Sequence, residues 1–147
     1  SPAKIIRLPR EKDDTDTAFA LKYVLELGFR EIYLIGAFGA LADHSLANLG
    51  LLKFARDRGS RAVLIDDYSV MEVITGTSRI SDSHRYFSLL AIYGTASNVS
   101  ISNAKYRIKN ATVTPENPFA VSNEIIDGDA LVCIGEGALL LIQSDQH

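Results

Sequence analysis

The first part of the chain alternates short apolar runs with longer segments of helical periodicity. Apolar residues recur every three or four positions over 15–27, and again from about 43 or 45 to 58, which predicts two helices that each end at a glycine. Apolar runs at 5–8, 31–35 and 61–65 predict three short strands. The order strand, helix, strand, helix, strand predicts parallel strands joined by right-handed crossovers.

The pattern changes after Asp67. Runs rich in Val, Ile, Tyr and Ser are separated by turn signals at intervals of about 8 to 12 residues, which predicts an antiparallel β-sandwich or small barrel. Its clearest element is a predicted hairpin with strands at 131–134 and 138–142. We therefore predict an α/β domain with a partial, Rossmann-like parallel layer over residues 1–67, and a β-sandwich domain over residues 68–147.

The predicted parallel layer is incomplete. A parallel sheet needs helices on both faces, but this part of the sequence predicts three strands and only two helices. We expect either that further strands precede Ser1 in the natural protein or that another subunit completes the layer.

Composition narrows the class of protein. The 15 Lys and Arg and the 18 Asp and Glu give a net charge of −3, which argues against a nucleic-acid binder held by bulk positive charge. The single cysteine, Cys133, cannot form an intrachain disulfide, and a reducing compartment, the cytoplasm, is the simpler expectation. No apolar run reaches the roughly 18 residues of a membrane helix, so we expect no membrane partner.

An acidic segment, residues 11–16, is the first candidate for chemistry. Carboxylates between a strand and a helix can hold Mg²⁺, while Lys12 can neutralise phosphate oxygens, as phosphoryl-type transfer requires. The alternative is an ordinary acidic helix start, with Asp14 or Thr15 as the cap. Spacing alone favours that alternative.

A loop of small residues, 36–48, is the second candidate. Helix starts present free amides to anions, and ligands of open parallel sheets bind beyond the carboxyl ends of the strands, where Asp43 is expected. The loop has neither a Walker lysine nor GxGxxG spacing. The alternative is that Asp43 caps the helix and His44 is structural.

Ser122 and Asn123 are the third candidate. Their neutral donors and acceptors suit the edge of a heteroaromatic ring, although a turn is the default interpretation of such residues. The sequence Asp127-Gly128-Asp129 resembles a metal site, but we predict a turn there.

Taken in order, these segments resemble the thiamine pyrophosphokinase family. The similarity rests on the run from Lys12 to Asp16, on the 36–48 segment with Asp43-His44, and on a β half that contains Ser122-Asn123 and ends in 137–141. It extends over nearly the whole chain. It implies transfer of a pyrophosphoryl group from ATP to thiamine, giving thiamine diphosphate and AMP with Mg²⁺, and a homodimer with active sites between the α/β part of one subunit and the sandwich of the other.

The resemblance also implies roles for single residues. Asp16 would be a catalytic carboxylate on the Mg²⁺ or phosphate side, and Lys12, Asp13 and Thr15 would lie in the nucleotide site. Asp43 would lie near the reacting hydroxyl of thiamine, where a carboxylate can orient that hydroxyl or accept its proton. The pair at 122–123 would face the thiamine ring.

Two departures from the family pattern leave alternatives open. Leu41 replaces a usual arginine, and an upstream Gly-Asp motif with a second acid is absent from these 147 residues. We therefore expect that the chain lacks its natural N-terminal part and is itself inactive as a kinase. The alternatives are a non-catalytic thiamine-binding or regulatory relative, and a structural dimerisation domain.

Overall fold

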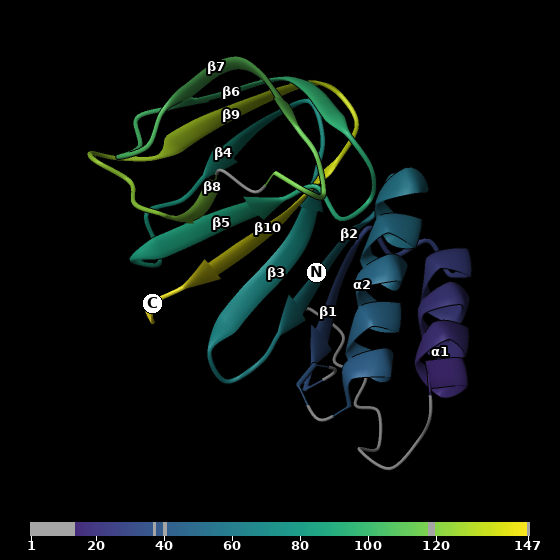
Figure 1. Cartoon of the computed structure of the whole chain (residues 1–147). Coiled ribbons are helices and arrows are strands. Elements are labelled where there is room, and N and C mark those ends of the chain that lie inside the picture. The colour runs from purple at the N-terminus through teal and green to yellow at the C-terminus, as the bar shows by residue number, and fades with distance from the viewer. Residues whose placement is uncertain (1–13, 37, 40, 118–119, 147) are drawn as a thin grey trace. The chain divides into compact units, whose positions relative to one another are not determined.

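The computed structural model describes residues 14–36, 38–39, 41–117 and 120–146, with the side chains at 14–16 and 120 left undescribed. The chain divides into two compact units, one that ends at Asp67 and one that begins at Tyr68, and each is described by itself (Figure 1). The predicted strand at 5–8 lies outside the described residues. None of the described helices is long and apolar enough to cross a membrane.

The first unit contains two helices and two parallel strands: α1 (Asp14–Glu26), β1 (Glu31–Ile35), α2 (Ala42–Asp57) and β2 (Arg61–Ile65). β1 and β2 run in parallel register from the Glu31 and Arg61 pair to the Ile35 and Ile65 pair. α1 and α2 lie side by side, and α2 packs on β2 (Figure 1). Both predicted helices and both of these strands are confirmed, while a wider Rossmann-like sheet stays a prediction.

Burial explains why these segments are stable. Three successive residues of β2 are buried, as expected for a parallel strand covered on both faces. In contrast, β1 buries only Leu34, and its Tyr33 and Ile35 are exposed. The helices bury the positions that the 3.6-residue period selects: Leu21, Val24, Leu49, Leu52 and Ala55.

The second unit is all β. Its strands are β3 (Ser69–Ile74), β4 (Thr77–Ile80), β5 (Tyr86–Leu90), β6 (Ala96–Ser102), β7 (Ile108–Val113), β8 (Ala120–Asn123), β9 (Ala130–Glu136) and β10 (Leu139–Ser144). The strands are antiparallel and lie in the orders β3-β10-β5-β8 and β4-β9-β6-β7. One buried cluster takes residues from both groups, among them Phe87 and Leu139 from the first and Val99 and Val132 from the second. The predicted antiparallel sandwich is confirmed.

The predicted hairpin at 131–142 is wrong in one respect. Both of its strands exist, but β9 pairs with β4 and β6, whereas β10 pairs with β3 and β5. Gly137 explains the change of sheet, because its φ is +95° and a Cβ there would lie 2.6 Å from the Thr95 carbonyl oxygen. The connection is a tight corner between sheets that only glycine fits.

Candidate functional site

The loop after β1 folds back onto the first turn of α2. The Gly36 N–H donates to the Ile65 carbonyl oxygen at 3.0 Å, which joins the carboxyl ends of β1 and β2. The Gly39 N–H then donates to the Ser45 hydroxyl at 2.9 Å. Ser45 is buried and its own N–H donates to the Leu41 carbonyl oxygen. This small serine thus fixes the loop that precedes Asp43.

Asp43 lies in the first turn of α2 but does not cap the helix. The N-cap is Leu41, which offers no side-chain cap among the described residues, so the interpretation of Asp43 as a cap is wrong. The Asp43 Oδ1 accepts the N–H of His44 at 2.9 Å, and the carboxylate is exposed at the positive end of the helix dipole. It is therefore accessible to a ligand.

The acidic segment is described only in part. Lys12 and Asp13 lie outside the described residues, and Thr15 and Asp16 lie in the first turn of α1 without described side chains. α1 and α2 begin at the same end of the unit, near the carboxyl end of β1 (Figure 1). The first turns that carry Asp16 and Asp43 therefore lie toward one end of the unit, while the placement of the Asp16 carboxylate stays a prediction.

The described residues do not form a complete metal site. No group of three or more His, Cys, Asp or Glu residues among them could hold a metal ion. Mg²⁺ needs fewer protein ligands, because it keeps several waters and binds one or two carboxylates together with substrate phosphates. A carboxylate at Asp16, with phosphate oxygens of a nucleotide, fits that donor chemistry.

Ser122 and Asn123 lie in strand β8, so the default interpretation of a turn is wrong. Ser122 has a left-handed backbone with φ of +53°, and its N–H donates to the Ser88 hydroxyl at 2.9 Å. Asn123 is 0% exposed. Its Nδ2 donates to the Tyr106 carbonyl oxygen at 2.8 Å, and its Oδ1 accepts the N–H groups of Tyr106 at 2.9 Å and Glu124 at 3.0 Å.

Charged residues that the sequence did not single out surround this segment. The Glu124 carboxylate lies 3.4 Å from Lys105 Nζ and 3.7 Å from Arg85 Nε. A hydrogen bond with Glu124 raises the pKa of Lys105 above its ordinary value. Both cations stay largely exposed while they pair with Glu124. Their pairing links residues far apart in the sequence, so no local signal predicts it.

A turn was predicted at Asp127-Gly128-Asp129, and the chain bends there over residues 126–128. Gly128 has a φ of +71°. The Asn103 side-chain amide donates to the carbonyl oxygens of Asp127 and Asp129. These contacts give the segment a structural role.

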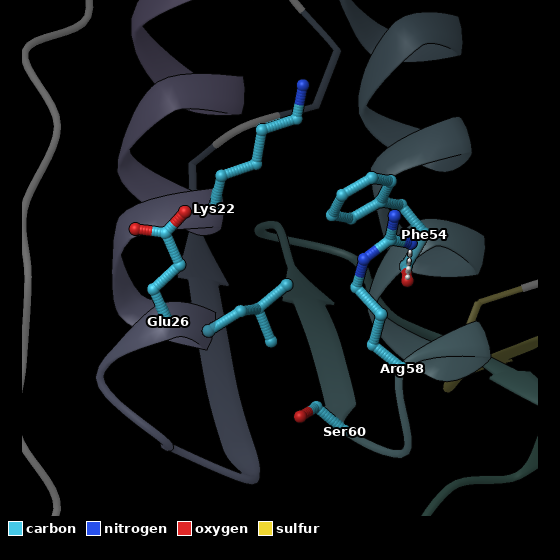
Figure 2. A pocket seen from close by; sticks show the side chains of 6 residues that line it. Lys22, Glu26, Phe54, Arg58 and Ser60 are labelled. Atoms are coloured by element: carbon cyan, nitrogen blue, oxygen red, sulfur yellow. Dashed lines mark hydrogen bonds between the residues drawn. The ribbon is translucent and has the colours of Figure 1, made fainter.

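An open pocket of about 460 Å³ lies at the other end of the first unit (Figure 2). It is bordered by the last turns of α1 and α2 and by the start of β2. The Arg58 guanidinium stacks on the Phe54 ring, 3.3 Å from its centroid, and donates to the Phe54 carbonyl oxygen. The lining residues are Lys22, Leu25, Glu26, Phe54, Arg58 and Ser60. The pocket is separate from the region of Asp43.

Comparisons with known families match the two units in tandem. Residues 1–76 match the thiamin pyrophosphokinase catalytic domain, and residues 76–138 match the thiamin pyrophosphokinase vitamin B1 binding domain. The two units therefore correspond to the catalytic and vitamin-binding domains of one class of kinase. The chain belongs to the thiamin pyrophosphokinase family.

Individual relatives agree with this assignment. The chain is 28% identical over 137 residues to the thiamine pyrophosphokinase of Bacillus subtilis, covering 91% of this chain and 64% of that protein. A crystal structure of the Bacillus subtilis thiamine pyrophosphokinase matches with a TM-score of 0.84 at 25% identity, covering 95% of this chain and 66% of that one. The thiamin pyrophosphokinase of Geobacillus thermodenitrificans matches with a TM-score of 0.81 at 30% identity, covering 94% and 65%. The chain thus spans less than two thirds of these relatives.

Proposed function

We propose that the protein transfers pyrophosphate from ATP to thiamine and so forms thiamine diphosphate and AMP. The observation that carries this proposal is the tandem match to a catalytic domain and a vitamin B1 binding domain, in that order along the chain. Each match falls mainly on one of the two compact units.

In the first unit, Asp43 acts on the thiamine hydroxyl. That hydroxyl is a weak nucleophile, so catalysis requires that it be held in line with the β-phosphorus of ATP. An exposed carboxylate at a helix start, on a loop fixed by Ser45, is suited to orient the hydroxyl or to accept its proton. The proton moves from the thiamine oxygen to a carboxylate oxygen as the new O–P bond to the β-phosphorus forms. The bond between the β-phosphorus and the oxygen that bridges to the α-phosphate breaks in the same step, so AMP leaves with that oxygen.

The nucleotide is held at the start of α1. Asp16 is the proposed carboxylate for Mg²⁺, and Lys12, Asp13 and Thr15 are its proposed neighbours around the phosphates. Bound Mg²⁺ supplies positive charge to the phosphate oxygens, where negative charge develops during transfer. Lys12 adds a cation to the same region.

In the second unit, Ser122 is the proposed direct contact to the thiamine ring. Its half-buried side chain lies in an irregular strand, and the two residues that follow it, Asn123 and Glu124, contact Tyr106 and Lys105. Asn123 has a supporting role in this site, because its buried side-chain amide hydrogen-bonds to the backbone N–H and carbonyl oxygen of Tyr106. This role is narrower than the expectation that both residues face thiamine.

The proposed assembly is a cytoplasmic homodimer, with each active site between the α/β unit of one subunit and the sandwich of the other. Exposed apolar side chains on the first unit support the proposal of a partner subunit, because contact between water and large apolar patches is unfavourable. These side chains include Phe19 at 73%, Tyr33 at 42% and Ile35 at 69% exposure.

A second function is a non-catalytic thiamine-binding or regulatory relative. Leu41 favours it, because this exposed N-cap residue of α2 stands where the resemblance leads us to expect an arginine for phosphate. In that case the sandwich would still recognise thiamine, but no transfer would occur.

Product analysis separates these functions. We expect the natural full-length protein, incubated with ATP, Mg²⁺ and thiamine, to release AMP and thiamine diphosphate in equal amounts, measured by chromatography. Formation of ADP with thiamine monophosphate would contradict pyrophosphoryl transfer. Thiamine binding without any AMP would support the non-catalytic relative.

A further inference from the structure

Strand β8 contains one more residue than its partner β5 across a short stretch. One residue, Ser88, lies opposite two residues, Val121 and Ser122, and the register shifts there. This two-against-one arrangement is a β-bulge, a feature enriched beside active sites, where it redirects a side chain. The pairs that flank it are Phe87 with Asn123 and Leu89 with Ala120.

The backbone of Ser122 is held in an uncommon conformation. Its φ of +53° lies in the left-handed region, which non-glycine residues adopt rarely and mostly where the surroundings impose it. The Ser88 hydroxyl accepts the Ser122 N–H at 2.9 Å in a partly buried position. The Ser88 hydroxyl thus provides the hydrogen-bond acceptor that a partly buried backbone N–H requires.

The segment is also fixed on the other side of Ser122. The Asn123 amide binds both backbone polar groups of Tyr106, and the Lys105 N–H donates to the Glu124 carbonyl oxygen at 2.8 Å. Because successive side chains of a strand point to opposite faces, a one-residue change of register would turn Ser122 to the other face. Its direction therefore depends on the bulge.

We propose that Ser88 is a positioning residue for thiamine recognition. Its hydroxyl holds the Ser122 backbone in the bulge, so that the Ser122 hydroxyl faces the thiamine ring, and Ser88 acts on thiamine through Ser122. This inference rests on the proposed function, in which Ser122 contacts thiamine directly.

A double-mutant cycle in the 147-residue chain tests the proposal. Thiamine is titrated by calorimetry into the unsubstituted chain, Ser88→Ala, Ser122→Ala and the double variant. We expect each single variant to bind thiamine about tenfold more weakly, the scale of one lost hydrogen bond. We expect the double variant to bind no more weakly than Ser122→Ala alone, because residues that act as one unit are not additive. Ser88→Thr keeps the hydroxyl and should restore affinity to within about threefold.

Ser100→Ala is the matched control. The Ser100 hydroxyl accepts the N–H of Asn110 at 3.0 Å, and Asn110 is also left-handed, with φ of +50°. This pair lies in β6 and β7, in the group of strands that does not include β8. The control therefore removes the same kind of hydrogen bond away from Ser122, and thiamine affinity should not change.

The outcomes distinguish two failures. If Ser122→Ala binds thiamine as tightly as the unsubstituted chain, the proposed thiamine site and this inference both fail. If Ser122→Ala weakens binding while Ser88→Ala does not, or if the two losses add in the double variant, only the role of Ser88 is overturned. Should Ser88→Ala not fold, Ser88→Cys replaces it in the cycle, since a thiol is a weaker acceptor, and the same non-additivity is expected.

Discussion

The side-chain amide of Asn123 binds both backbone polar groups of Tyr106, with Nδ2 donating to the carbonyl oxygen at 2.8 Å and Oδ1 accepting the N–H at 2.9 Å. The two residues lie 17 positions apart in the sequence. The amide imitates a β-ladder pair and so joins the edge strand β8 to the segment that precedes β7. The shape of the proposed thiamine site depends on this pairing.

Asn123→Ala should therefore destabilise the fold. The change leaves partly buried backbone groups of Tyr106 and Glu124 without their partner, and we expect the free energy of unfolding to fall by about 2 to 4 kcal/mol. Urea denaturation followed by circular dichroism measures it. Asn117→Ala, at an exposed position, is the control and should change stability by less than about 0.5 kcal/mol. Equal stabilities of the two variants would contradict a supporting role for Asn123.

Asp43→Asn should lower turnover by roughly a hundredfold or more, the scale for one group that acts on transition-state charge. The fold should stay intact, because Asp43 is exposed and asparagine keeps an oxygen that can accept the His44 N–H. Turnover is measured as AMP release by the natural full-length protein. Asp57→Asn, which removes an exposed partner of Lys53 near the other end of α2, is the control. Near-full activity of Asp43→Asn would refute the assigned role.

Asp16→Asn is expected to reduce turnover on the same scale, roughly a hundredfold. Asparagine also suits a helix start, so thermal unfolding should change little. If Asp16 holds Mg²⁺, the variant should also need a higher Mg²⁺ concentration for half-maximal AMP release. An unchanged Mg²⁺ requirement would remove Asp16 from the metal site.

Gly137→Ala should destabilise the second unit strongly. The substitution combines a left-handed φ of +95° with a Cβ placed 2.6 Å from the Thr95 carbonyl oxygen, and we expect a loss of about 3 kcal/mol or more. Gly128→Ala has a φ of +71° but open space around the new Cβ, so it should cost only about 1 kcal/mol. Similar unfolding midpoints for the two variants would contradict the tight corner between β9 and β10.

The protein should be a homodimer at micromolar concentration, because apolar side chains such as Phe19 and Ile35 are largely exposed in the single chain. Static light scattering measures the mass directly. A mass of one chain would contradict the proposed assembly.

Local patterns predicted the elements well, because helical period and short β-branched runs reflect burial of each segment by itself. α2 was predicted to end at Arg58 and ends at Asp57. Pairing between segments was not predictable in the same way. β9 and β10 follow each other closely but join different partners, since the corner at Gly137 directs them into different sheets.

The candidate site follows the same pattern: the elements that carry its residues were predictable, but the contacts of those residues were not. Asp43 was predicted at the start of a helix and lies there. Its exposure and the position of Leu41 as the N-cap could be determined only from the structure. Ser122 was predicted as a site residue, whereas its acceptor, Ser88, lies 34 positions away. A serine in an alternating strand carries no sequence signal for such a contact.

Calorimetric titration of the 147-residue chain, first with thiamine and then with ATP and Mg²⁺, tests whether the sandwich binds thiamine. We expect saturable thiamine binding that Ser122→Ala weakens by about 1 to 3 kcal/mol, the cost of an unpaired ligand group. We also expect ATP with Mg²⁺ to bind through a different unit, so that Ser122→Ala leaves the ATP response unchanged. Tight ATP binding with no response to thiamine would contradict the assignment of the sandwich as the thiamine-binding unit.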